Sequence, residues 1–165
     1  MWNAFILAFA MTVAVGDARW RRIPRWLTTG GLIAGLTYHI FYGGFWLALA
    51  TAGLAFGLGL GLYELGAIGG GDVKLVTALG GILGFQHWTL AVEVAITVAG
   101  VMALAGVIRR RVLLQTFRNI GRLLKHFATN GFTAHPEIQV NNEGLVRIPF
   151  GVAAALGTIF AVVRQ

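Results

Sequence analysis

The chain has 165 residues, of which 57% are hydrophobic and 12% are charged, and its mean hydropathy is +0.76. This apolar content is more than one globular core can bury, so the composition favours a membrane protein over a soluble domain. Cysteine and serine are both absent, which excludes a disulfide framework, a thiolate metal site and a cysteine or serine nucleophile.

Six apolar segments predict an all-α, polytopic membrane protein with six transmembrane helices, folded as one domain over residues 1–165. The first and fourth segments are shorter than the ~20 residues that a bilayer span needs, which indicates a thinned or water-filled region beside them. The segments are 2–16, 27–42, 45–65, 73–85, 88–108 and 148–163.

The distribution of basic residues predicts the orientation of these spans. Arginine and lysine collect in the cytoplasmic loops of membrane proteins, and here they follow the first and fifth segments, while Lys74 lies at the start of the fourth. Both termini are therefore expected outside the cell, in a multi-pass protein of the inner (plasma) membrane. The same rule accounts for the net charge of +7, so we expect no nucleic-acid partner. The loop residues are Arg19, Arg21, Arg22, Arg25, Arg109, Arg110, Arg111, Arg118, Arg122, Lys125 and Arg147, and only Arg164 falls on the other side.

Residues 109–128 predict an amphipathic helix on the cytoplasmic membrane surface, followed by a polar loop over 129–144. Both lie within the predicted non-spanning part, 109–146. Apolar and basic side chains recur on opposite faces at helical spacing. We expect this helix to lie against anionic lipid, with contact to a substrate or partner as the alternative. The apolar face holds Leu113, Phe117, Ile120, Leu124 and Phe127, and the basic face holds Arg111, Arg118, Arg122 and Lys125.

A glycine turn carries the first candidate catalytic residue, Asp72. It follows Gly69, Gly70 and Gly71 directly and precedes an apolar segment. An ionisable residue at a membrane span is a functional-site hypothesis by default, although Asp72 could simply cap the following helix. Three glycines also let an extended peptide approach closely, so we expect them to support substrate binding.

Asp17 is the second candidate. It ends the first apolar segment, where a negative charge opposes the helix dipole, and a structural ion pair with the nearby arginines is the alternative. With six spans, Asp17 and Asp72 lie at the same membrane face. Two carboxylates that share a proton can act as general base and general acid, so the pair predicts hydrolysis by an aspartyl dyad.

Other polar residues have supporting roles in this interpretation. We expect Glu64 to hydrogen-bond within the site, and Lys74 either to bias the titration of the aspartates or to reach lipid phosphate. Glu93 is interpreted as a packing residue. The histidines show no metal-ligand spacing, so we predict no metal and no cofactor.

Three motifs resemble those of the type IV prepilin peptidases, which are intramembrane aspartyl proteases. Residues 69–75 resemble the family's GxGDxKL signature. Asp17, followed by Ile23-Pro24 and Leu27-Thr28, resembles its first aspartate motif, and 148–151 resembles the Pro-Phe-Gly that opens its last helix. The sequence departs from the family pattern at Arg25, where Asn is usual, and at Val152, where Pro is frequent.

This resemblance implies that Asp17 and Asp72 are the catalytic pair and that the substrates are prepilins or pilin-like precursors. Their short basic leader would be cut at the cytoplasmic face, with Glu64 as a contact. The chain resembles the short form of the family, without the cysteine-containing insert, so no methyltransferase activity is expected. Two other functions remain open: an ion-coupled transporter that uses the aspartates as ion carriers, and an inactive assembly protein of a secretion system.

Overall fold

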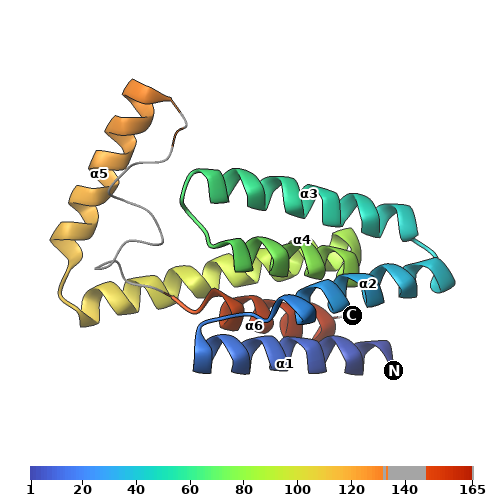
Figure 1. Cartoon of the computed structure of the whole chain (residues 1–165). Coiled ribbons are helices and arrows are strands. Elements are labelled where there is room, and N and C mark those ends of the chain that lie inside the picture. Colours follow the sequence, from blue (N-terminus) through green and yellow to red (C-terminus); the bar gives the residue numbers. More distant parts are fainter. Residues whose placement is uncertain (132, 134–147, 165) are drawn as a thin grey trace.

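A computed structural model describes residues 1–131, 133 and 148–164 of the chain. Its regular structure is entirely helical over these residues (Figure 1). The predicted apolar segments lie in helices, except for Leu65 at the end of the third and Ile148 and Pro149 at the start of the sixth. The all-α prediction is therefore confirmed. The helices are α1 (Trp2–Trp20), α2 (Arg25–Tyr42), α3 (Phe45–Glu64), α4 (Gly70–Arg109), α5 (Leu113–Asn130) and α6 (Phe150–Val163).

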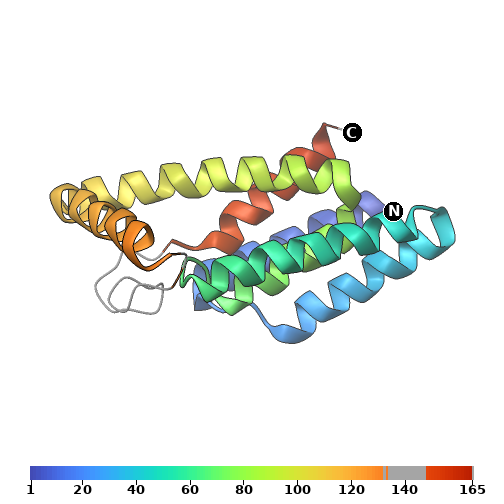
Figure 2. The same ribbon diagram turned by 90° about the horizontal axis from the view of Figure 1, so that it is seen from above.

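The predicted fourth and fifth segments are two rods of one bent helix, α4. The bend is at Gly84, whose φ of 67° and ψ of 176° belong to a region that is open almost only to glycine. Trp88 Nε1 donates a hydrogen bond to the carbonyl oxygen of Val76 at 3.1 Å. Twelve residues of straight helix would separate these groups by about 18 Å, so the chain must fold back at Gly84 (Figure 2).

Helix α4 lies at the centre of the bundle and packs against α2, α3 and α6. Helix α1 packs chiefly against α6. Small residues allow these close approaches: a Cβ atom placed on Gly35 of α2 would lie 2.6 Å from the carbonyl oxygen of Gly81 in α4. Larger apolar side chains, including Ile6, Leu75 and Ile82, fill the core between the helices.

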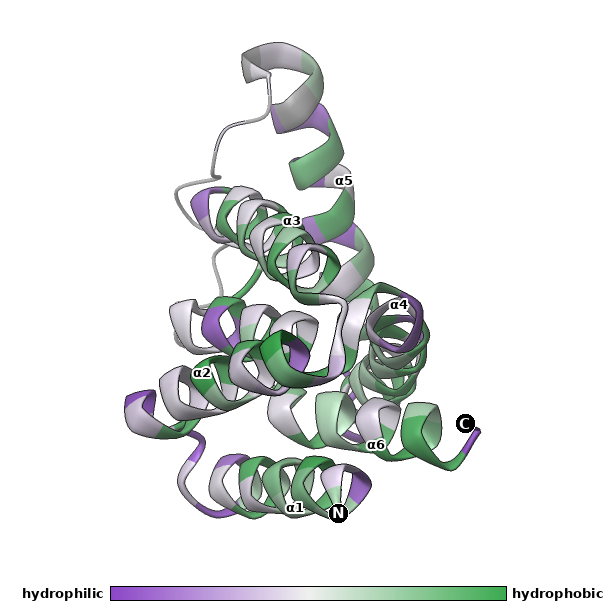
Figure 3. Ribbon diagram, turned by 90° about the vertical axis from the view of Figure 1, so that its right-hand side faces the viewer, coloured by the Kyte–Doolittle hydropathy of each residue, from purple (hydrophilic) through white to green (hydrophobic). Residues whose placement is uncertain are grey.

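Large apolar side chains cover much of the outside of the bundle. Phe41 and Trp46 are each 78% exposed, and Ile96 is 62% exposed. An apolar outer surface of this extent suits lipid and not water, and hydrophobic residues occupy most of α3, α4 and α6 (Figure 3). In the described part of the chain, α3 and α4 are long and apolar enough to cross a membrane. The number of spans, six, stays a prediction.

Helix α5 stands away from the other helices (Figure 1). The helical conformation is interrupted at Arg111, which has a φ of 56°. Helix α5 therefore begins later than the predicted residue 109. It also continues through Thr129 and Asn130, which were expected to open the loop. Its apolar face is uncovered, with Phe117 69% and Leu124 65% exposed. The rest of the predicted loop, apart from Gly131 and Thr133, and the side chain of Phe127 lie outside the described residues.

Candidate functional site

Asp17 lies in the last turn of α1, because the helix continues past the apolar segment to Trp20. Its side chain is buried, with only 8% of its surface exposed. Among the described residues it forms no ion pair, so the predicted alternative of a structural pair with nearby arginines is not supported there. Its partner is a backbone group: the N–H of Gly151 donates to Asp17 Oδ2 at 2.6 Å.

Gly151 reaches Asp17 because of where α6 begins. Pro149 precedes the helix, Phe150 is its first residue and Gly151 its second. The N–H groups of the first helical turn have no partner within their own helix, so that of Gly151 is available to a neighbour. A Cβ atom on Gly151 would lie 2.8 Å from both Cβ and Oδ2 of Asp17. The contact therefore depends on a residue without a side chain.

Asp72 is held by a similar bond at the start of α4. It is the third residue of that helix, and its Oδ2 accepts a hydrogen bond from the N–H of Gly69 at 3.2 Å. The N-cap residue of α4 is thus Gly69, whereas the alternative interpretation of the sequence placed Asp72 there. The Asp72 side chain instead bonds the backbone of the N-cap residue, as the acidic residue of a capping box does. Gly70 and Gly71 are exposed, and nothing lies within 4 Å of a Cβ atom placed on Gly71.

Asp17 and Asp72 lie within reach of each other's charge, since the Asp17 carboxylate disfavours a negative charge on Asp72. Helix α6 packs against both of their helices, α1 and α4. Each uses Oδ2 to accept a glycine N–H, and neither Oδ1 has a hydrogen-bond partner among the described residues. Two carboxylates that come within hydrogen-bond distance of each other can share one proton and act as an acid and a base.

Two supporting residues, Glu64 and Lys74, form no bond with this pair among the described residues. Glu64 is the last residue of α3 and Lys74 is the fifth of α4, and both are exposed. Neither forms an ion pair or a side-chain hydrogen bond with another described residue. The hydrogen bond expected between Glu64 and the site is therefore not present among these residues.

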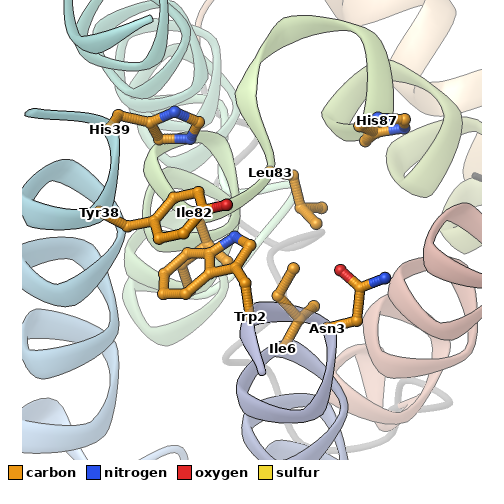
Figure 4. A pocket seen from close by; sticks show the side chains of 8 residues that line it. All are labelled: Trp2, Asn3, Ile6, Tyr38, His39, Ile82, Leu83 and His87. Atoms are coloured by element: carbon orange, nitrogen blue, oxygen red, sulfur yellow. The ribbon is translucent and has the colours of Figure 1, made fainter. Parts of the chain in front are cut away.

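A separate cavity of about 390 Å³ is lined by residues from the start of α1, the end of α2 and the bend of α4 (Figure 4). Trp2 lines it, and Asp17 is about 22 Å further along α1. His39 and His87 also line the cavity, and the buried Nε2 of His39 has no hydrogen-bond partner. Within the described ranges, no three histidine, aspartate or glutamate residues are grouped as metal ligands.

Gly151 is the residue of the site that the sequence did not reveal. The Pro-Phe-Gly motif indicated that a helix begins there, since proline is common at helix starts. No pattern in the sequence joins that helix start to an aspartate 134 residues away. The contact follows from tertiary packing, which places α6 against α1.

Comparison with known proteins identifies the family. Residues 4–104, more than half of the chain, match the family model of the type IV leader peptidase family. The match spans both aspartates and the glycine turn but ends before Gly151. No curated protein sequence and no solved structure matches the chain. With its apolar helices, the matched family indicates a membrane protein. The chain belongs to the type IV leader peptidase family and is a peptidase of that kind.

Proposed function

We propose that the protein is an aspartyl endopeptidase that removes the short basic leader of type IV prepilin-like precursors, with Asp17 and Asp72 as its catalytic pair. The observation that carries this proposal is that two aspartates from distant parts of a family member are each held by a glycine N–H at a helix start, on helices that both pack against α6. Both carboxylates keep Oδ1 free of bonds to described residues, as a pair that works on water requires.

Hydrolysis by this pair needs one ionised and one protonated carboxyl group. The ionised group takes a proton from water as the water oxygen attacks the carbonyl carbon of the scissile peptide bond. The protonated group donates its proton to the carbonyl oxygen, which gives a tetrahedral intermediate. When this intermediate collapses, the C–N bond breaks and the leaving amine takes the proton that the first carboxylate removed from water. One hydroxyl proton of the intermediate returns to the second carboxylate, so that the leader is released as a carboxylic acid and the pair is restored.

The substrate would approach from the side of Asp72. Asp17 is 8% exposed, whereas Asp72 is only half-buried and the adjoining Gly70 and Gly71 are exposed. An extended peptide can lie against glycines at a distance that side chains would prevent. Glu64, exposed at the end of α3, would attract the basic leader, while the apolar helix of the precursor stays in the membrane.

The charge distribution supports a site that faces the cytoplasm from the plasma membrane. Arg21 follows α1, Lys74 lies near the start of α4, and Arg109 ends α4. These positions share the end of the bundle that holds the aspartates, and the two termini lie at the other end (Figure 1). By the positive-inside rule, this arrangement favours a multi-pass protein with both termini outside. Helix α5 would rest on anionic lipid at the same face.

Incubation of the detergent-solubilised protein with a purified prepilin tests the proposal. We expect a shortened pilin whose new N-terminus is the first residue after the leader, identified by mass spectrometry. Failure to form this product, combined with proton or ion flux in proteoliposomes, would replace the peptidase proposal with the transporter. Absence of both product and flux would favour the inactive assembly protein.

A further inference from the structure

We infer that Gly151 is a positioning residue: its backbone N–H holds Oδ2 of Asp17, which orients the carboxylate and leaves Oδ1 for the reacting water. This inference rests on the proposed peptidase function. It adds α6, which lies outside the residues that match the family model, to the machinery of the site.

The hydrogen bond itself is the first support. At 2.6 Å, the distance between Gly151 N and Asp17 Oδ2 is short even for a bond to a charged acceptor. The donor is in the first turn of α6, where free N–H groups and the helix dipole both favour a negative charge. No other described residue donates a hydrogen bond to the Asp17 side chain. The orientation of this carboxylate therefore depends on Gly151.

The space at Gly151 is the second support. An added Cβ atom would lie 2.8 Å from Asp17 Oδ2 and 2.9 Å from its Cγ, inside the 3.4 Å at which ordinary contact begins. Asp17 and Gly151 are both buried, and so are Ala153 and Ala154 on the same helix. The surrounding packing therefore opposes a shift of α6 that would relieve the clash. Only glycine allows the N–H to come this close.

The expected effect on catalysis follows from these distances. Relief of the clash in Gly151→Ala requires Asp17 Oδ2 to move by about 0.6 Å, the difference between 3.4 and 2.8 Å. Misplacement of a catalytic group by about 1 Å can cost a hundredfold in rate. We therefore expect kcat of Gly151→Ala to fall about ten- to hundredfold, while KM for the prepilin stays near the wild-type value because the substrate-facing glycines are untouched.

Gly31→Ala is the matched control. Gly31 is also a buried helix glycine, and a Cβ atom placed there would strike a side chain of α1, lying 2.5 Å from Cε2 of Phe9. Phe9 is half the helix away from Asp17, so the control loses packing without moving the carboxylate. We expect its folded fraction to keep the wild-type kcat. Equal losses of kcat in both variants, at equal losses of thermal stability, would overturn the positioning role.

A second variant removes the donor without adding an atom. Glycolic acid incorporated at position 151 by in vitro translation replaces the N–H with an ester oxygen, and no Cβ atom is introduced. We expect the same selective loss of kcat. A wild-type kcat in this variant would overturn the inference, even if Gly151→Ala proves too unstable to assay.

The inference and the peptidase proposal can fail separately. If the wild-type protein cuts prepilin and both changes at position 151 leave kcat intact, only the inference fails. If the wild-type protein cuts nothing, the peptidase proposal fails. The contact between Gly151 and Asp17 is then tested by a double-mutant cycle of melting temperatures. Gly151→Ala should then lower the melting temperature less in an Asp17→Gly background, which lacks the atoms that clash. Additive shifts in this cycle would overturn the role of Gly151 in holding Asp17.

Discussion

The backbone N–H of Gly151 lies 2.6 Å from Oδ2 of Asp17, although 134 residues separate the two in the chain. A glycine at the start of α4 makes the corresponding contact with the other aspartate, since Gly69 donates to Oδ2 of Asp72 at 3.2 Å. Both carboxylates are thus held by helix N-termini, which stabilise negative charge. The start of α6 thus holds the carboxylate at the end of α1, and the start of α4 holds its own carboxylate.

The bend in α4 predicts that substitution of Gly84 destabilises the fold more than substitution of another glycine in the same helix. Its φ of 67° and ψ of 176° are strained for any residue with a side chain, so Gly84→Ala should lower the free energy of unfolding by about 1–3 kcal/mol. Thermal or denaturant unfolding in detergent measures this loss. Gly100→Ala, in the same helix with nothing within 4 Å of its Cβ position, is the control and should be neutral or slightly stabilising. Equal stability of the two variants would contradict the bend.

The proposed orientation can be tested by cysteine labelling, because the chain has no cysteine of its own. Gln86 and Ala67 are both exposed, Gln86 beside the bend in α4 and Ala67 between α3 and α4 near Asp72. In intact cells, a membrane-impermeant maleimide should label Gln86→Cys but should reach Ala67→Cys only after permeabilisation. The opposite result would mean that the topology is inverted. Labelling of both sites in intact cells would mean that positions 86 and 67 lie on the same, outer face of the membrane.

Helix α5 should lie in the membrane interface with Phe117 towards lipid. Phe117 is 69% exposed, and the neighbouring Arg118 is exposed on the basic face. Spin labels on Phe117→Cys and Arg118→Cys, in vesicles that contain anionic lipid, distinguish the two faces. The label at 117 should be relaxed mainly by oxygen and the label at 118 mainly by a water-soluble nickel complex. Equal access of the nickel complex to both labels would place α5 in water.

Much of the fold could be predicted from the sequence because long apolar runs leave few alternatives to helices. The amphipathic helix α5 could also be predicted, since apolar and basic residues recur on two opposite faces at helical spacing. The position of the bend in α4 could not be predicted from the sequence. Gly80, Gly81 and Gly84 lie close together, and only the backbone conformation distinguishes Gly84. The expected break at 86–87 lies beyond the actual one.

The site was predictable in part for a related reason. A charged residue at the end of an apolar run is conspicuous, so the sequence points to Asp17 and Asp72, and each of them accepts a glycine N–H at a helix start. Glu64 was assigned a role for its place at the inner end of the third segment and Lys74 for its closeness to Asp72, and their exposed side chains have no bond to the pair. Gly151 could not be found this way, because a glycine that provides only a backbone N–H has no chemical signature.

The central claim is that Asp17 and Asp72 together hydrolyse the leader peptide bond, and the most direct measurement is the cleavage rate of three purified variants on one prepilin. Asp17→Asn and Asp72→Asn should each cut at least about a hundredfold more slowly than the wild-type protein, because each removes one partner of the acid–base pair. Glu93→Gln, which neutralises an exposed carboxylate elsewhere on α4, should cut at the wild-type rate. Wild-type cleavage by either asparagine variant would contradict the catalytic pair.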